Sequence, residues 1–331
     1  MVRLLFGLAL LKITETFNIW EVGRKSGAIP EVRISDITPQ TFFTRYRIAP
    51  FVVRGFHKTL DELAADAGFQ GDSFDWLRET IGDRELISSV EGELQETRKA
   101  PTLPNVKWKY FFEAFRDVDM YAVSKAPNSV RPFLRILPYL ACGGLSSGMR
   151  PPTMWMSGGL KSSRSVVHAD SFYNQHCVLK GTKRFLLIPP FVDIERPEFG
   201  WVQVTTENGV KPEGFEQSYG EFVAGLDPDN VDLDRMPGWK DVPWLYTELN
   251  SGDCIYIPTE WYHYVESNPE PTLTWHLWFN IPDEWDESDR CSEELNWFPS
   301  SACRFREDWW EEKRNSNFWE AQPDSIKSIC N

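Results

Sequence analysis

Polar and apolar side chains alternate cleanly in the segment 272–279. Its even-numbered positions are polar up to His276, and its odd-numbered positions are apolar: Leu273, Trp275, Leu277 and Phe279. A period of two residues is typical of a β-strand with one polar and one apolar face. The pattern therefore predicts a strand whose apolar face lies in a core and whose polar face, with Thr272, Thr274 and His276, lines a site.

Two further stretches also predict strands. Residues 174–190 contain two apolar runs around Gly181 and end in a Pro pair, which we interpret as a β-hairpin. Residues 252–258 begin with a Gly-Asp turn and continue as a run of β-branched and aromatic side chains. Strands of this kind on both sides of a long connection favour a mainly β fold.

Upstream of these strands the pattern predicts helices. Residues 41–55 are typical of a helix followed by a strand, and three later helices are expected at residues 59–67, 74–80 and 107–115. Thr59 and Ser73 are the expected N-caps of the first two of these three. The predicted helices would flank the β core.

A split set of metal-ligating side chains lies on the predicted strands. His168 and Asp170 are two residues apart, so they project from the same face of an extended segment. His263 follows 95 residues later, which is too far for a hairpin and requires a fold that joins remote strands, such as a double-stranded β-helix. A lone His-x-Asp is not specific. Two imidazoles and one carboxylate are nevertheless the facial triad of non-haem Fe(II) oxygenases, which leaves positions open for co-substrate and dioxygen.

Lys183 lies at the start of the second run of the expected hairpin, on the same strand face as Phe185 and Leu187. A lysine on an apolar face is costly unless its charge is paired. Either Lys183 extends from the turn to water, or it pairs with the carboxylate of a ligand.

In combination these residues resemble the Jumonji-C (JmjC) 2-oxoglutarate oxygenases. The similarity is strongest to the small JmjC-only hydroxylases that resemble the asparaginyl hydroxylase acting on hypoxia-inducible factor, and it covers roughly residues 155–280. The motifs that carry it are His168-x-Asp170, Asn174, Gly181-x-Lys183-Arg184, Pro189-Pro190, Gly252-Asp253, Tyr256-Ile257-Pro258 and Trp261-Tyr262-His263. The resemblance implies a double-stranded β-helix, or jelly-roll, core of the cupin type.

The resemblance also implies a set of cofactors and the residues that bind them. Fe(II) would be held by His168, Asp170 and His263, with 2-oxoglutarate as co-substrate and O2 as the second substrate. The distal carboxylate of 2-oxoglutarate would form a salt bridge with Lys183 and a hydrogen bond with Ser165, which stands where the family often has Thr.

Two further positions are implied to support the co-substrate. Asn174 corresponds to a family Asn whose side-chain amide can donate to the chelating carboxylate. His276 departs from the pattern, because the hydroxylase branch commonly has Asn there. We expect His276 beside the ligand shell and not among the metal ligands, with a core His bonded to a neighbouring strand as the alternative.

The implied function is that of a 2-oxoglutarate-dependent dioxygenase, an oxidoreductase that hydroxylates a protein side chain and releases succinate and CO2. Two alternatives stay open at this point. One is N-methyl-lysine demethylation, which begins with the same hydrogen abstraction. The other is a catalytically inactive JmjC scaffold, although intact ligands and Lys183 argue against it.

The chain of 331 residues is expected to divide into three parts. Residues 1–125 would form an N-terminal region of helices and strands that supports the core. Residues 126–282 would form the JmjC catalytic domain, with an acidic insertion at about 191–250. Residues 283–331 would form an acidic, Trp-rich extension that packs on the core or provides a surface for a homodimer or another partner.

The formal net charge of −14 arises from two stretches. Residues 201–250 carry ten acids and three bases, and residues 281–331 carry thirteen and six. Such a protein is a poor match for nucleic acid, whose phosphates require Lys and Arg. A protein or peptide substrate is expected, and a basic one would match the net charge better.

The location of the protein in the cell is weakly defined by the sequence. The first eleven residues resemble the charged start and short apolar core of a secretory signal, but no clear cleavage site follows, and the segment is too short to span a membrane. Six Cys permit disulfides in an oxidising lumen, yet Cys177 and Cys254 lie in predicted core strands where a free thiol is equally natural. The balance slightly favours an intracellular enzyme, with the endoplasmic reticulum lumen as the alternative.

Overall fold

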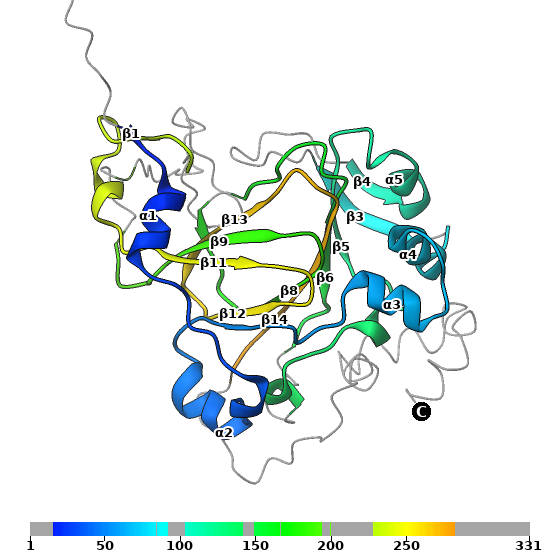
Figure 1. The fold of residues 1–331 in the computed structure, drawn as a ribbon, viewed down its shortest axis with the longest axis horizontal. Helices are drawn as coiled ribbons and strands as arrows, with labels where there is room; N and C mark the ends of the chain where they lie inside the picture. The colour runs from blue at the N-terminus through cyan, green and yellow to red at the C-terminus, as the bar shows by residue number, and fades with distance from the viewer. Residues whose placement is uncertain are drawn as a thin grey trace, which may run out of the picture.

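The structure is a computed structural model that describes residues 16–83, 85–91, 103–141, 149–165, 167–193, 199 and 228–281 (Figure 1). The first eleven residues, much of the acidic insertion and the extension at 283–331 lie outside the described residues. The expectations about a signal, a homodimer and contact through the Trp-rich tail therefore stay predictions. No helix in the described part of the chain is long and apolar enough to cross a membrane.

Two sheets form the centre of the molecule (Figure 1). The small sheet has four strands in the order β11-β9-β13-β7, and the large sheet has eight in the order β2-β12-β8-β14-β6-β5-β3-β4. The strands of the small sheet are β7 (His168–Ala169), β9 (Lys183–Ile188), β11 (Leu245–Leu249) and β13 (Tyr262–Ser267). Those of the large sheet are β2 (Phe51–Val53), β3 (Leu86–Glu91), β4 (Leu103–Lys107), β5 (Tyr121–Lys125), β6 (Thr153–Ser157), β8 (Tyr173–Lys180), β12 (Cys254–Ile257) and β14 (Thr272–Phe279). A short pair, β1 (Thr16–Phe17) and β10 (Val231–Asp232), lies apart from both.

This architecture confirms the predicted mainly β fold with a jelly-roll core, but the predicted β-hairpin is wrong. β8 pairs with β12 and β14 in the large sheet, whereas β9 pairs with β11 and β13 in the small one. The turn between them is a corner from one sheet to the other. Gly181 there has a φ of +80°, and a Cβ would lie 2.8 Å from Thr272 Cγ2, so the corner requires glycine. Two apolar runs around a glycine do not distinguish a hairpin from such a corner.

Helices cover the outer faces of both sheets. They are α1 (Ile19–Ser26), α2 (Pro39–Thr41), α3 (Leu60–Asp66), α4 (Ser73–Ile81), α5 (Trp108–Ala114) and the π-helical turn η2 (Phe42–Tyr46). Short 3-10 turns occur at η1 (Ile34–Asp36), η3 (Arg131–Phe133), η4 (Pro138–Ala141) and η6 (Pro237–Asp241). The predicted helices are present, and Thr59 caps α3 through a capping box with Glu62. The cap of α4 is Asp72 and not the expected Ser73.

The alternation of apolar and polar residues along β14 places its odd-numbered side chains in a core and its even-numbered side chains on the opposite face. The odd-numbered side chains of β14 have zero exposure and join a large core with α3, α4 and α5. A second core lies under α1, which packs on the outer face of the small sheet. A third, which includes Phe185, Leu187 and Ile257, fills the space between the two sheets. The even-numbered side chains of β14 face this space between the sheets.

The strands on either side of residue 125 belong to one sheet. β5 pairs with β6 in register from Tyr121↔Ser157 to Lys125↔Thr153, so the large sheet crosses the expected limit between the first two parts of the chain. The division into three parts stays a prediction.

Cys177 and Cys254 form a disulfide between the paired strands β8 and β12. Both residues are fully buried in the large core, on the face of β8 opposite to Asn174 and His176. Of the two alternatives that the sequence left open for these cysteines, the structure has the disulfide and not the free thiols.

Candidate metal centre and co-substrate pocket

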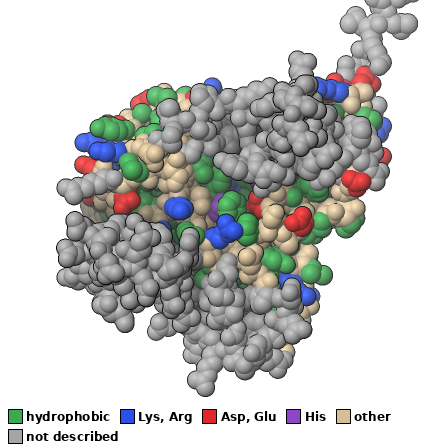
Figure 2. All heavy atoms as spheres, turned by 180° about the vertical axis from the view of Figure 1, so that it is seen from behind, with side chains coloured by type: hydrophobic (Ala, Val, Ile, Leu, Met, Phe, Trp, Pro, Cys, Tyr) green, Lys and Arg blue, Asp and Glu red, His purple; other side chains and the backbone are tan. Residues whose placement is uncertain are grey.

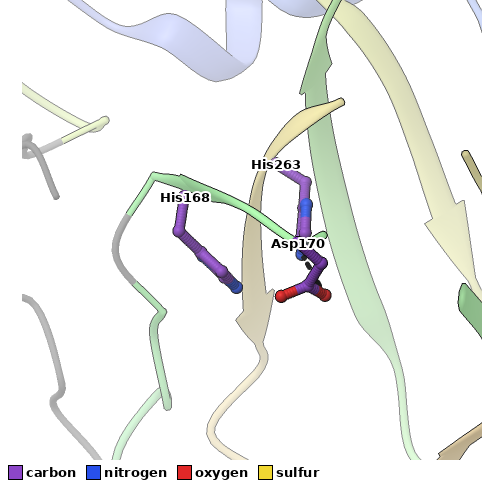
Figure 3. Close-up of side chains that lie close together, drawn as sticks. All are labelled: His168, Asp170 and His263. Atoms are coloured by element: carbon purple, nitrogen blue, oxygen red, sulfur yellow. Dashed lines mark ion pairs between the residues drawn. The ribbon is translucent and has the colours of Figure 1, made fainter. Parts of the chain in front are cut away.

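His168, Asp170 and His263 come together at the edge of the small sheet (Figure 3). β7 pairs with β13 in a register that places His168 directly opposite His263, and their ring centroids are 4.2 Å apart. Asp170 follows two residues after His168 and projects from the same side. One ligand atom from each side chain lies within 4.8 Å of the other two. The 95-residue separation is thus closed by one antiparallel strand pair.

Neighbouring groups hold the three side chains in orientations that suit a metal. His263 Nδ1 lies 3.0 Å from the carbonyl oxygen of Trp261, so Nδ1 carries the hydrogen and donates, and Nε2 keeps its lone pair. That Nε2 lies 3.8 Å from Asp170 Oδ2, which accepts a hydrogen bond of 3.1 Å from Trp278 Nε1. A buried carboxylate with imidazole lone pairs beside it fits a divalent cation.

The turn between β12 and β13 ties the two ligand segments together. The Thr259 hydroxyl and the Glu260 backbone N–H both donate to the carbonyl oxygen of Asp170, at 3.2 and 3.0 Å. Glu260 has a φ of +65°, which is uncommon for a residue with a side chain and is often found near functional sites.

The Asp170 carboxyl is held in its ionised form. Burial alone would raise its pKa, but the imidazoles of His263 and His168 and the Trp278 N–H together bring the pKa below its ordinary value. An ionised carboxylate is the form that binds a metal.

Lys183 lies on the same face of the small sheet, deeper between the sheets. Its side chain is only 3% exposed, so the alternative in which it extends to water is wrong. Its Nζ donates to the Tyr121 hydroxyl at 3.0 Å, and no carboxylate in the described ranges forms an ion pair with it. Burial lowers the pKa of Lys183 to about 7. The site therefore holds a buried lysine amine, charged below about pH 7, that has no counter-ion among the described residues.

Tyr121 is a pocket residue that the sequence analysis missed. It lies on β5, next to Trp155 on β6, and lines the same cavity as Lys183. The recognised motifs begin near residue 155, so they gave no reason to single out Tyr121. A signal was present in the apolar run at 121–123, which predicts a strand, but nothing in one sequence shows which strand faces the pocket.

His276 has one hydrogen bond and one free ring nitrogen. Trp155 Nε1 donates to His276 Nδ1 at 2.9 Å, and an indole N–H can only donate. Burial lowers the pKa of His276 to about 4, so the ring is neutral and Nε2 carries its hydrogen. Nε2–H is buried without a partner among the described residues and belongs to the pocket lining. His276 is thus both bonded to a neighbouring strand and available as a donor.

The other predicted residues also line this pocket. Asn174 Oδ1 is buried without a partner in the described part of the chain. Ser165 Oγ accepts from the Val265 backbone N–H at 2.8 Å, which leaves its hydroxyl hydrogen free to donate. His176, which the sequence analysis did not select, lies opposite His276 across β8 and β14, and burial lowers its pKa well below the ordinary value.

Four of the five histidines in the sequence therefore line one pocket. The fifth, His57, is buried in the large core. Its Nδ1 lies 2.7 Å from the Lys58 carbonyl oxygen and its Nε2 accepts from the Arg135 backbone N–H at 3.0 Å. Both of its nitrogens are satisfied, so His57 has a structural role.

The pocket between the sheets has a volume of about 570 Å³. The triad lines one part of it, and the residues that line the rest include Lys183, Tyr121, Asn174, His176 and His276. It thus combines a set of metal ligands with a buried cation and several unpartnered hydrogen-bonding groups, which is the arrangement of a site for a small polar anion next to a metal.

Comparisons with known proteins give the family. Residues 47–284, well over half of the chain, match the model of the cupin-like domain. The human bifunctional peptidase and (3S)-lysyl hydroxylase JMJD7 is 28% identical over 37% of this chain and 40% of its own length. JmjC domain-containing protein C of Dictyostelium discoideum is 30% identical over 31% of this chain and 21% of its own length. Lysine-specific demethylase JMJ31 of Arabidopsis thaliana is 28% identical over 40% of this chain and 22% of its own length.

The matched segments span less than half of the length of each of these relatives. The first is named a peptidase and lysyl hydroxylase, the second is named for its JmjC domain, and the third is named a lysine-specific demethylase. The chain belongs to the cupin-like domain family, and within it to the JmjC-domain proteins.

Proposed function

We propose that this protein is an Fe(II)- and 2-oxoglutarate-dependent dioxygenase that hydroxylates a side chain of a protein or peptide, with release of succinate and CO2. The observation that carries the proposal is Lys183, a buried cation without a described counter-ion in the same cavity as the triad. A buried charge of this kind is costly unless an anion pairs with it. A protein that only held a metal would have no use for it.

The two ends of the cavity match the two ends of 2-oxoglutarate. Lys183 lies on β9 four residues from Leu187, which pairs with His263, so its Cα is about 13 Å along the strand from the level of the triad. The lysine side chain and a five-carbon diacid together span that interval. Lys183, Tyr121 and Ser165 would bind the distal carboxylate, while the Asn174 side chain, through Nδ2, and His276 Nε2–H would donate to oxygen atoms near the metal.

His168, Asp170 and His263 would hold Fe(II), whose chemistry is the activation of O2 coupled to the oxidation of 2-oxoglutarate. The protein itself orients the ligands through Trp261 and Trp278 and excludes water by packing the cavity between two sheets.

Hydroxylation is favoured over demethylation by the charges of the pocket. The described lining contains the cations Arg150, Arg164 and Lys183 and one carboxylate, Asp170, which would bind the metal. Because Lys183 would pair with 2-oxoglutarate and Arg164 pairs with Asp229 and Glu266, the charge that would repel a methylated ammonium group is that of Arg150. Of the relatives, JMJD7 is named a lysyl hydroxylase and JMJ31 a lysine-specific demethylase, so both reactions are present among similar proteins.

The test is succinate formation by the full chain with Fe(II), O2 and 2-oxoglutarate, together with the variants His168→Ala and Lys183→Ala. Lys180→Ala is the matched control, because Lys180 is a neighbouring lysine that instead pairs with Asp61 on the surface. Succinate is expected from the wild type and Lys180→Ala, with at least about 30-fold less from the other two at limiting 2-oxoglutarate. Equal turnover by His168→Ala and wild type would contradict the proposal.

The mass of the peptide products distinguishes hydroxylation from demethylation. Hydroxylation adds one oxygen atom to an unmodified peptide, whereas demethylation removes one methyl group from a methyl-lysine peptide. The proposal predicts the first change and would be replaced by the demethylase alternative if only the second occurred. Absence of succinate with every peptide would favour the scaffold alternative.

A further inference from the structure

One cation at the mouth of the pocket has no acidic partner in the described part of the chain. Arg150 is exposed, and its guanidinium carbon lies 3.8 Å from the centre of the Phe172 ring. The neighbouring cation Arg164 is already paired, with Asp229 at 2.7 Å and Glu266 at 3.2 Å. Arg150 is therefore the cation of the mouth that is available to a ligand from solution.

The described residues that line the pocket include more cations than carboxylates, although the protein as a whole is acidic. The described lining contains three cations, and its single carboxylate is the predicted metal ligand Asp170. Figure 2 shows a His side chain at the bottom of a hollow, with Lys or Arg side chains on its rim. Because charges act mainly over a distance of about 8–10 Å in physiological salt, the groups at the mouth decide which ligands are attracted there.

A short series of contacts links Arg150 to the triad. The guanidinium lies on Phe172, whose ring centre is 6.2 Å from that of Trp278, and Trp278 donates to Asp170. The backbone N–H of Arg150 also donates to the carbonyl oxygen of Trp278 at 2.7 Å. Arg150 is thus fixed to the strand that positions the metal ligand, a few side chains away from the reacting position.

From these contacts we infer that Arg150 selects peptide substrates with an Asp or Glu side chain close to the modified residue. The inference rests on the proposed function. A guanidinium binds a carboxylate through two parallel hydrogen bonds, and the Phe172 ring contacts its face while leaving its N–H edge free for them. An acidic segment thus replaces the basic one that the net charge of −14 led us to expect, because that charge comes from residues 201–250 and 281–331.

The experiment measures binding, so that it does not depend on catalysis. Three fluorescent peptide libraries share a fixed length and a randomised central residue, and their flanking positions are filled with Asp and Glu, with Asn and Gln, or with Lys and Arg. Their affinity for the full chain is measured by anisotropy with wild type, Arg150→Gln and Arg150→Glu. Arg33→Gln is the matched control, because Arg33 is an exposed arginine remote from the pocket that pairs with Asp36.

The wild type and Arg33→Gln are expected to bind the acidic library about tenfold more tightly than the amide library. The difference should disappear in Arg150→Gln, and Arg150→Glu should prefer the basic library. Equal binding of all libraries by the wild type, or an acidic preference that survives in Arg150→Glu, would overturn the inference.

Succinate formation without peptide separates this inference from the proposed function. If the wild type forms succinate but does not prefer the acidic library, only the inference about the substrate fails. If no protein forms succinate, either alone or with any peptide, the proposed function fails, and the anisotropy result still decides whether Arg150 binds acidic peptides.

Discussion

At the scale of single residues, Lys183 is the side chain that indicates which kind of ligand the pocket binds. The three ligands define a place for a metal, but many cupin-type sites could hold one. Lys183 adds a positive charge that is 3% exposed and whose described polar contact is the neutral Tyr121 hydroxyl. We therefore expect the site to prefer an anion, such as the dicarboxylate 2-oxoglutarate, over a neutral ligand.

The lowered pKa of Lys183 predicts that 2-oxoglutarate binding depends on pH. Burial lowers this pKa to about 7, so the amine is charged below pH 7 and loses its proton as the pH rises. Since only the charged form pairs with a carboxylate, affinity for 2-oxoglutarate should fall by up to about tenfold per pH unit above pH 7. Calorimetric titration of the metal-loaded protein over this range measures the slope.

Lys183→Arg is the control for that slope. A guanidinium stays charged at these pH values, so a variant that still binds 2-oxoglutarate should show a flat profile above pH 7. An unchanged slope in Lys183→Arg would assign the titration to another group.

Trp155 acts on the pocket through His276. Its indole N–H fixes the His276 tautomer, so Trp155→Phe should free the ring to adopt either tautomer and raise KM for 2-oxoglutarate about tenfold with little change in kcat. Trp244→Phe is the control for packing, because Trp244 is fully buried in the second core, more deeply than the half-buried Trp155, and its Nε1 has no described hydrogen-bond partner. A similar rise in KM in both variants would point to a general loss of packing.

At the scale of elements, strand pairing explains why ligands far apart in the sequence meet. The β7–β13 pair brings His168 opposite His263, and the β9–β13 pair sets Lys183 at the other end of the same face.

Glu266 supports this sheet from β13, where it is 2% exposed and pairs with Arg184 at 2.7 Å and Arg164 at 3.2 Å. In the Gly181-x-Lys183-Arg184 motif, Arg184 thus has a structural role, whereas the role proposed for Lys183 is to bind the co-substrate.

Removing the Glu266 carboxylate should destabilise the small sheet. Glu266→Ala leaves two arginine side chains without their shared partner, and because these are about one-fifth exposed the expected loss is about 2 kcal/mol, less than for a fully buried pair. Denaturant unfolding measures the change. No loss of stability would show that the ion pairs contribute nothing beyond their desolvation cost.

The disulfide between β8 and β12 should stabilise the large sheet. It closes a loop with a sequence separation of 77 residues, for which chain entropy predicts a contribution of about 4.5 kcal/mol. The double variant Cys177→Ala/Cys254→Ala should therefore unfold at a lower temperature than the oxidised protein. Reductant should lower the Tm of the wild type and leave the double variant unchanged, and a wild-type Tm that does not respond to reductant would contradict the assignment.

At the scale of the whole molecule, periodicity and spacing predicted the class of fold and the identity of the triad. Alternation in 272–279 correctly assigned the odd-numbered side chains of β14 to the core. Of the three polar positions expected at the site, His276 lines the pocket, whereas Thr272 and Thr274 are buried and do not. The pairing of strands was harder to predict, because the same apolar runs around Gly181 suit a hairpin or a corner between sheets. Tyr121, Trp155 and Trp278 were missed for a related reason, since only the three-dimensional arrangement shows which strands face the cavity.

Net charge was the least informative property of the whole chain for the site. The value of −14 sums over segments that lie largely outside the described residues, whereas the described lining of the pocket carries more cations than carboxylates. A global charge predicts solubility and long-range steering, but close contacts decide which substrate binds.

The central claim is that the triad and Lys183 form one site for a metal and a dicarboxylate. It is tested most directly by calorimetric titration of 2-oxoglutarate into the full chain under anaerobic conditions, with and without Fe(II). We predict binding that requires the metal, is weakened at least about 30-fold in Lys183→Ala and is unchanged in Lys180→Ala. Binding of 2-oxoglutarate to Lys183→Ala with wild-type affinity, or equal binding with and without the metal, would contradict the claim.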